Sequence, residues 1–203
     1  MMSFVPWQVR SESADAATLV ARVTRGDRAA LAALYRREAG PVYRYALALC
    51  GNEAWAADVT HDAFIAFAQR PEAFEPQRGS LGAYLAGVAR HGVLALWRQA
   101  RTTLSPADLG GDDDASDGDS GDTDAAHASP ETLLVRAQTT RELWRALDAL
   151  SFVYREAVVL VDLQERPYAD AARIAGIELN TLRTRLHRAR ARLAQLLGAG
   201  DPS

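Results

Sequence analysis

An acidic segment divides the sequence into two parts and limits the folds open to it. Residues 106–131 contain nine Asp and Glu residues, no basic residue and many Gly, Ser and Thr residues. Such a composition buries too little apolar surface to offset the entropy lost on ordering, and its like charges extend the chain. We therefore expect a flexible acidic linker over 102–130, with one folded part on each side.

Two short patterns in this segment resemble functional loops. Gly118-Asp119-Ser120-Gly121 resembles the nucleophile loop of trypsin-like proteases, but the alternating strands and disulfides of such enzymes are missing from the sequence. The clustered aspartates do not fit a calcium-binding EF-hand loop. With Gly118 in the sixth place, Ala115 takes the third place and no Glu ends the loop. We interpret the segment as a solvated tether.

The parts on both sides of the linker show helical periodicity. Their apolar residues recur every three or four positions rather than every second position, so we predict an all-α fold with two helical domains. Asp27 and Ser80 are expected N-caps, and Gly40-Pro41 is an expected helix end. The predicted helices cover residues 28–40, 42–50, 53–69, 81–101, 131–150, 152–163, 168–175 and 180–197.

The net charge of −3 conceals a segregation of charge. Residues 1–105 carry +3, residues 106–131 carry −9 and residues 132–203 carry +3. All 23 basic residues are arginine, whose planar guanidinium suits phosphate and guanine. A GC-rich genome also favours arginine over lysine, so the positions of the arginines, rather than their number, have to indicate function.

Cysteine content and hydropathy exclude several classes of protein. The single cysteine, Cys50, excludes a disulfide framework and Cys-based metal clusters. No signal-peptide pattern occurs in the first thirty residues, and no apolar run approaches the roughly 20 residues of a membrane span. We expect a cytoplasmic protein with no membrane insertion.

The C-terminal part carries the pattern of a helix-turn-helix. Two predicted helices flank Gly176-Ile177, and the second has arginines on both sides of an exposed polar ridge. Such a helix suits the major groove, because the ridge meets base edges while the arginines meet both phosphate backbones. A solvated basic helix is the alternative. The expected buried face is Leu182, Leu186, Ala189, Leu193 and Leu197, the ridge is Thr184, His187 and Ala191, and the arginines are Arg183, Arg185, Arg188, Arg190 and Arg192.

The predicted helix over 53–69 has an apolar side and a mixed side. Val59, Ala63, Phe64 and Phe67 form the expected inner face, and Asp58, His61, Asp62 and Ile65 share the opposite side. An outward Ile beside two carboxylates one turn apart indicates a docking surface for a basic or mixed partner, with an ordinary solvated face as the alternative. Acid–base chemistry or a metal site at His61 lacks a second set of ligands nearby in the sequence.

The long predicted helix over 81–101 combines basic residues with an outward tryptophan. Leu81, Leu85, Val88, Gly92 and Leu96 form its inner stripe, and the outward side carries Arg90, His91, Leu94, Trp97, Arg98 and Arg101. Single-stranded nucleic acid binds to such surfaces, because charge meets the backbone and a flat ring stacks on an unpaired base. Alternatively, Trp97 packs against another helix of its own domain.

Taken together, these motifs resemble a bacterial RNA polymerase sigma factor of the extracytoplasmic-function (ECF) group. Residues 58–64 resemble the core-binding helix of the family's second region. Residues 74–81, Tyr84-Leu85 and 88–91 resemble the segment that melts and reads the minus-ten element. Residues 168–172, Gly176, Asn180-Thr181 and 183–190 resemble the fourth region, which reads the minus-thirty-five element. The resemblance implies an arm over 1–14, region 2 over 15–101, the linker over 102–130, region 4 over 131–198 and a tail over 199–203.

The resemblance also implies a mechanism, namely transcription initiation without catalysis, cofactor or metal. The helix with Asp58, His61, Asp62 and Ile65 would dock on the clamp helices of the largest subunit of core RNA polymerase, and the C-terminal domain would sit on the flap of the second-largest. An anti-sigma factor is an expected further partner. Promoter DNA would meet Asn180, Thr181, Arg183, Thr184, Arg185, His187 and Arg188 at the minus-thirty-five element, and Arg78, Tyr84, Arg90, His91, Trp97, Arg98 and Arg101 at the minus-ten element.

Two other functions are weighed against this one. A stand-alone helix-turn-helix regulator would use the same C-terminal helices but would never join polymerase. An enzyme with a regulatory tail would need a nucleophile or metal set, and Ser120, Cys50, His61 and His127 have no recognisable partners in the sequence. A further hypothesis is that the −9 linker competes for basic surfaces or threads a basic channel of polymerase.

Overall fold

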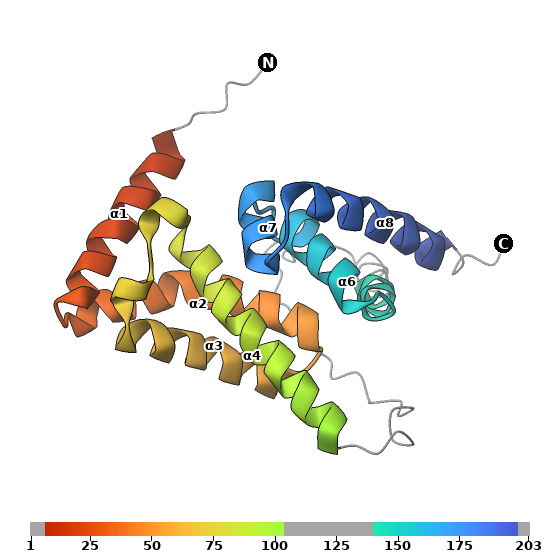
Figure 1. Ribbon diagram of the computed structural model, residues 1–203, viewed down its shortest axis with the longest axis horizontal. Helices are drawn as coiled ribbons and strands as arrows, with labels where there is room; N and C mark the ends of the chain where they lie inside the picture. The colour runs from red at the N-terminus through yellow and green to blue at the C-terminus, as the bar shows by residue number, and fades with distance from the viewer. Residues whose placement is uncertain (1–6, 104–139, 199–203) are drawn as a thin grey trace, which may run out of the picture.

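The computed structural model describes residues 7–103 and 140–198, with side chains over 16–100 and 140–198 (Figure 1). Every regular element in these ranges is helical, which confirms the predicted all-α class. Helix α4 extends through Thr103 and so includes the first two residues of the expected linker, whereas the rest of the linker and its proposed role lie outside the described residues. The N-terminal unit contains α1 (Trp7–Thr24), α2 (Arg28–Cys50), α3 (Glu53–Gln69), two 3₁₀ turns, η1 (Pro71–Ala73) and η2 (Pro76–Arg78), and α4 (Leu81–Thr103).

The C-terminal unit begins with a helical stretch over 140–148. It continues with α6 (Phe152–Val158), which runs directly into the π-helix η4 (Val159–Leu163), and then with α7 (Tyr168–Ala175) and α8 (Leu179–Gly198). The predicted start of the helix over 131–150 falls outside the described residues. At the other end of the chain, α1 begins at Trp7, inside the segment expected as an N-terminal arm.

Capping residues set the helix starts of the N-terminal unit. The Asp27 carboxylate accepts hydrogen bonds from the backbone N–H groups of Ala29 and Ala30, at 2.9 and 3.1 Å. Ser80 Oγ caps α4 in the same way by accepting from the Ala83 N–H at 3.2 Å. Both residues are N-caps, as predicted. A side-chain oxygen at this position accepts hydrogen bonds from N–H groups that have no partner within the helix.

The predicted break at Gly40-Pro41 is wrong, because α2 runs through both residues to Cys50. Proline within a helix removes one backbone hydrogen bond and crowds the preceding turn. Tertiary packing outweighs this cost, since Val42, Tyr45 and Leu49 beyond the proline are fully buried. The carbonyl of Pro41 is also used, accepting a hydrogen bond from Gln164 Nε2 at 2.8 Å.

The core of the N-terminal unit lies between α2, α3 and α4. The predicted inner face of α3 is confirmed, since Val59, Ala63, Phe64 and Phe67 are all buried. Gly92 allows α3 and α4 to approach closely, because a Cβ at this position would lie 2.8 Å from Cγ1 of Val59. These helices therefore pack closely together, and the polar side of α3 faces outward.

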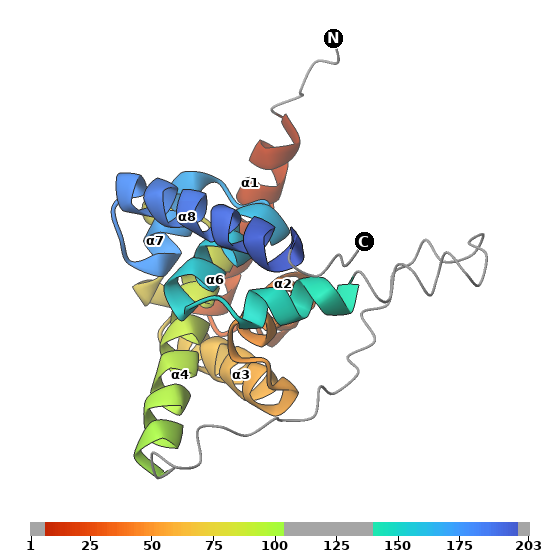
Figure 2. The same ribbon diagram turned by 90° about the vertical axis from the view of Figure 1, so that its right-hand side faces the viewer.

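The two units pack against each other. The views in Figures 1 and 2 agree in placing the C-terminal helices along one side of the N-terminal bundle, and α7 contacts α4. Helix α4 is consequently covered on two sides, by α2 and α3 within its own unit and by α6 and α7 of the other. None of the helices in the described ranges has the length and apolar character needed to cross a membrane.

Candidate nucleic-acid and protein interfaces

The helix-turn-helix predicted from the sequence is present in the C-terminal unit. Helix α7 buries Ala171, Ala172, Ile174 and Ala175, and Gly176 ends it in the left-handed conformation with φ 66°. The Ile177 N–H donates to the Ala172 carbonyl at 3.0 Å and closes the turn. Glycine suits this turn because the left-handed region carries no Cβ penalty for it.

Helix α8 presents its polar side to solvent. The buried face is Leu182, Leu186, Ala189 and Leu193, whereas Leu197 in the last turn is 43% exposed, so the prediction that Leu197 belongs to the buried face is wrong. Arg185 is half-buried, and the other predicted minus-thirty-five residues are exposed: Asn180, Thr181, Arg183, Thr184, His187 and Arg188. Their DNA contacts remain a prediction.

Arg190 differs from the other arginines of α8 because a carboxylate from another element holds it. Its guanidinium donates to both Asp162 oxygens, from Nε at 3.0 Å and from Nη2 at 2.5 Å. These hydrogen bonds raise the pKa of Arg190. Asp162 lies in η4, 28 positions earlier in the chain, so no helical-wheel pattern could reveal the pair. The pair joins α8 to η4.

The mixed side of α3 lies exposed, as predicted. Asp58, His61 and Asp62 are exposed, and the side chain of Ile65 is 40% exposed. The exposed side of this helix could be predicted because the opposite side, with Phe64 and Phe67, is unambiguously apolar. Whether this surface docks a partner remains a prediction.

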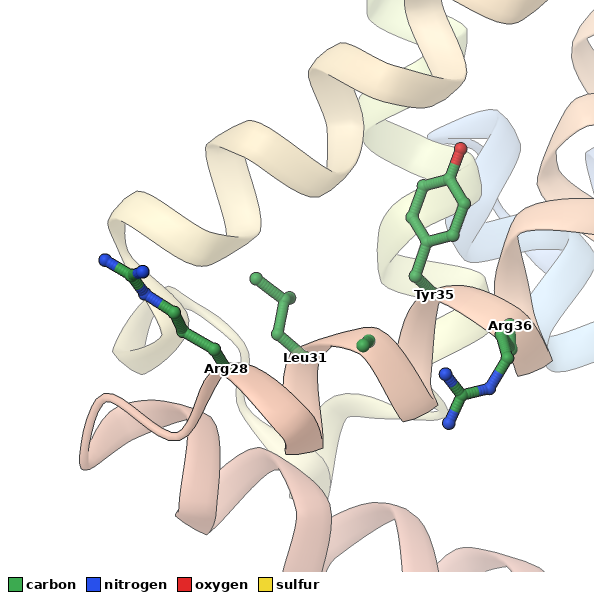
Figure 3. Close-up of a pocket in the computed structure, with 5 residues that line it drawn as sticks. Arg28, Leu31, Tyr35 and Arg36 are labelled. Atoms are coloured by element: carbon green, nitrogen blue, oxygen red, sulfur yellow. The ribbon is translucent and has the colours of Figure 1, made fainter.

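A shallow groove on α2 was missed by the sequence analysis. It has a volume of about 380 Å³ and is lined by Arg28, Leu31, Ala32, Tyr35 and Arg36. Figure 3 shows Leu31 and Tyr35 pointing away from α2, with Arg28 at one end of the row and Arg36 at the other. The Tyr35 ring contacts Phe64 of α3 at 4.7 Å between centroids, so the groove adjoins the helix that carries Ile65.

The predicted minus-ten residues fall into different environments. Arg78, His91 and Arg98 are exposed. Tyr84 is half-buried, and its ring lies 6.4 Å from that of Phe67 and 5.7 Å from that of Phe74, so it forms part of the core edge. The Arg101 side chain lies outside the described residues.

The prediction that Arg90 and Trp97 point outward is wrong, because both side chains face α6. Arg90 Nε lies 2.5 Å from Oε1 of Glu156, and Nη2 lies 3.3 Å from Oε2. The Trp97 ring packs edge-on against Phe152 at 5.3 Å between centroids. The Trp97 ring packs against another helix, as the alternative expects, but Phe152 belongs to a helix of the C-terminal unit rather than to Trp97's own domain.

Glu156 is a buried carboxylate between the two units. Its side chain is 1% exposed, and besides Arg90 it accepts a hydrogen bond from the Tyr45 hydroxyl at 2.9 Å. Burying a carboxylate is costly unless it is paired and hydrogen-bonded, and both partners come from the N-terminal unit. The sequence does not distinguish Glu156 from the other acidic residues, except that it lies just before the apolar run 157–161, which favours burial.

Tyr45 makes the contact between the units sensitive to alkaline pH. Burial, followed by the neighbouring Glu156 charge, raises the pKa of Tyr45 well above its usual value of 10.0. Above pH 10 the unfolded chain has therefore lost a phenolic proton that the folded chain keeps, so stability falls as pH rises. The stabilisation is complete below about pH 10, and its loss reaches at most about 1.4 kcal/mol per pH unit.

Urea unfolding between about pH 9 and pH 11 tests this expectation. The free energy of unfolding of the wild type should fall more steeply with pH than that of Tyr45→Phe, which has no phenol to ionise. Tyr168→Phe is the matched control, since Tyr168 is 39% exposed. Equal slopes for the wild type and Tyr45→Phe would contradict the assignment.

Arg155 is a second buried charge between the units, and the sequence analysis missed it as well. Its guanidinium donates to the carbonyls of Leu147 at 3.0 Å, Asp148 at 2.6 Å and Leu49 at 3.0 Å. Leu49 belongs to α2, so one side chain joins α6 both to the end of the preceding helical stretch and to the N-terminal unit. Burial lowers the pKa of Arg155, although a guanidinium stays charged.

Among the described residues, no three His, Cys, Asp or Glu side chains gather as metal ligands would. Cys50 is a free thiol, and burial raises its pKa. The candidate sites in the described residues are surfaces, namely an arginine-bearing helix, a mixed helix face and a shallow groove.

Comparison with known families matches both units. The Sigma-70 region 2 model matches residues 34–103, and the Sigma-70 region 4 model matches residues 140–193. The proteins similar to the chain include several ECF RNA polymerase sigma factors. SigM of Mycobacterium tuberculosis is 30% identical over 93% of this chain and 87% of its own length. BldN of Streptomyces coelicolor is 29% identical over 92% of this chain and 67% of its own length. SigE of Mycolicibacterium smegmatis is 30% identical over 85% of this chain and 64% of its own length. The chain therefore spans about two thirds of each of these two relatives.

Two solved structures have the same fold. CnrH, solved in complex with the cytosolic domain of CnrY, superimposes with a TM-score of 0.65 and 22% identity over 92% of this chain and 99% of CnrH. RpoE of Bartonella quintana, solved with the anti-sigma factor NepR, gives a TM-score of 0.62 and 23% identity over 82% of this chain and 96% of RpoE. With both sigma-70 regions present in order and the similarity to SigM spanning nearly the whole chain, the protein belongs to the ECF group of RNA polymerase sigma factors.

Proposed function

We propose that this chain binds core RNA polymerase and directs it to promoters, acting by binding and DNA melting rather than by catalysis. The observation that carries the proposal is the order of sigma-70 regions 2 and 4 on two helical units. Run-off transcription with purified core polymerase tests it. Transcripts with defined start sites should appear only when the chain is added, and their absence from all templates would contradict the proposal.

Promoter contact at the minus-thirty-five element is assigned to α8. Its exposed ridge is free of acidic residues from Asn180 to the end of the helix, so duplex DNA meets no negative charge from this helix. Asn180 Oδ1 accepts from Arg183 Nη1 at 3.2 Å, which orients that guanidinium at the start of the helix. The minus-ten element is assigned to α4 and the turn before it, with Arg78, His91 and Arg98 exposed.

Docking on core polymerase is assigned to the outer surface of α3 and the adjoining groove of α2. Ile65 and Tyr35 offer apolar area, Asp58 and Asp62 offer negative charge, and arginines lie at both ends of the groove. Such a mixed surface fits a helical partner with apolar and charged residues on one face. We assign the clamp helices of the largest subunit to this surface and the flap of the second-largest subunit to the C-terminal unit.

Charge reversal on α3 is expected to weaken holoenzyme assembly. Asp58→Arg combined with Asp62→Arg should raise the dissociation constant for core polymerase by about tenfold to a hundredfold, because complementary charges become repulsive. Competition of labelled variants for core polymerase measures the constant.

The control replaces Glu53 and Glu72 with Arg, which adds the same charge at exposed positions of the same unit. This variant should assemble like the wild type, and circular dichroism should show that both variants fold. Normal assembly by the Asp58 and Asp62 variant would remove the docking assignment.

An anti-sigma factor completes the proposed set of partners. RpoE of Bartonella quintana, which shares this fold, was solved together with its anti-sigma factor NepR. A protein inhibitor of this kind would act where polymerase acts, so we assign the chain to the cytoplasm. A stand-alone regulator would bind DNA through α8 without being required for core polymerase to initiate, and the run-off assay separates the two functions.

A further inference from the structure

Helix α6 presents an aromatic ring and a carboxylate one helical turn apart. Phe152 and Glu156 are separated by four positions, so they lie on the same side of the helix. Both meet the same face of α4, where Arg90 and Trp97 are separated by two turns. The contact joins the two units at residues that are far apart in the sequence.

Glu156 and Phe152 contact Arg90 and Trp97 in the way that a nucleotide contacts a nucleic-acid-binding surface. The Arg90 guanidinium grips the Glu156 carboxylate through two nitrogens, as it would grip a phosphate. The Arg90 guanidinium also lies 5.7 Å from the centre of the Phe152 ring, and Trp97 packs against the same ring at 5.3 Å. An anion beside a flat ring is what arginine and tryptophan recognise in single-stranded nucleic acid.

We propose that Phe152 and Glu156 mimic a nucleotide of single-stranded DNA, so that α6 occupies the strand-binding face of α4 while the two units are closed. This inference rests on the proposed function, because it assumes that α4 binds an unpaired promoter strand. The Arg90 side chain is only 16% exposed in the closed arrangement, so a strand cannot reach it until α6 leaves. Opening of the chain and strand binding are therefore coupled.

Other contacts between the units hold the closed arrangement. Tyr45 gives Glu156 a second partner, and Gln164 and Arg155 donate to carbonyls of α2 at 2.8 and 3.0 Å. At Gly79, a Cβ would overlap the Arg173 guanidinium of α7, so the first helix of the helix-turn-helix lies against the turn that precedes α4. In this closed arrangement the predicted DNA-contact residues of α8 are exposed, apart from the half-buried Arg185. The closed chain can thus meet duplex DNA through α8, but a single strand cannot reach Arg90 and Trp97 of α4.

Fluorescence anisotropy of the full chain with a fluorescein-labelled single-stranded DNA of mixed sequence tests the proposal without polymerase. Glu156→Gln removes the anion and Phe152→Ala removes the ring. Each should tighten binding by about tenfold, within the range that one base–aromatic contact provides. Val153→Ala is the matched control at the neighbouring, 36% exposed position and should bind like the wild type. Phe152→Leu keeps the apolar volume without the ring and replaces Phe152→Ala if circular dichroism shows that the latter is unfolded.

Adding Arg90→Ala to the Glu156→Gln variant identifies the surface that has been uncovered. The gain in binding should disappear, and if it persists the strand binds elsewhere and the proposal is wrong. Folded Glu156→Gln and Phe152 variants that bind no more tightly than the wild type would also overturn it. The run-off assay tests the proposed function separately. If that function is wrong, the assay gives no transcripts with defined start sites.

Discussion

Replacing Arg185 and Arg188 together with Ala should weaken promoter binding by the holoenzyme by about a hundredfold or more, because each arginine–base or arginine–phosphate contact is worth about 1–3 kcal/mol. Arg188 is exposed and Arg185 is half-buried on α8, whose opposite side is anchored by Leu182, Leu186 and Ala189. If the two guanidiniums displace counterions from DNA, the slope of log K against log salt should fall by about 2. Titration of a labelled promoter fragment at several salt concentrations measures both quantities.

Arg190→Ala is the control on the same helix. The Arg190 guanidinium already donates to both Asp162 oxygens, so we expect it to make no phosphate contact of its own. The salt slope of this variant should stay close to that of the wild type. Unchanged affinity and slope in the Arg185 and Arg188 variant would show that α8 does not carry the promoter contact.

Arg155→Met should lower the free energy of unfolding by about 3–5 kcal/mol, because a buried acceptor left without its donor costs about 1–3 kcal/mol and several acceptors depend on this one guanidinium. The substitution keeps the length of the side chain but leaves the carbonyls of Leu147, Asp148 and Leu49 without that donor. Arg155 is 8% exposed, so water replaces the lost hydrogen bonds poorly. Urea unfolding followed by circular dichroism measures the change.

Arg145→Met provides the comparison, since Arg145 is exposed on the preceding helical stretch. Exposed substitutions of this kind usually change stability by less than about 0.5 kcal/mol. If Arg155→Met is equally mild, the hydrogen bonds of its guanidinium do not support the fold. Because Leu49 lies in the N-terminal unit, loss of Arg155 should also increase amide exchange at the end of α2.

Local features of the fold followed directly from the sequence. The N-caps at Asp27 and Ser80, the end of α2 before Gly51 and the inner face of α3 all depend on residues within one or two turns. Capping, left-handed glycine and helical periodicity act over that same distance, so they leave a signal in the sequence. The exposed residues of α8 followed for the same reason, since its apolar side is regular up to Leu193.

Features that depend on a second helix could not be predicted in this way. The sequence marked Gly40-Pro41 as a break, yet packing of α2 beyond the proline keeps it one helix. Tyr35 follows the fully buried Leu34 in the sequence, yet it lines a groove and is 43% exposed. Arg190 has no acidic neighbour within α8, and only the tertiary structure shows that it pairs with Asp162 of η4.

The sequence by itself determined the all-α class, the two sigma-70 regions and the arginine-bearing side of α8, because these depend on the order and periodicity of neighbouring residues. Only the tertiary structure decided that α6 covers the side of α4 that carries Arg90 and Trp97. Arg90 and Trp97 read as outward residues on their own helix, and their partners Glu156 and Phe152 are more than fifty positions away. The physical reason is that a buried ion pair forms only where two separate elements exclude water together, and no local pattern encodes that meeting.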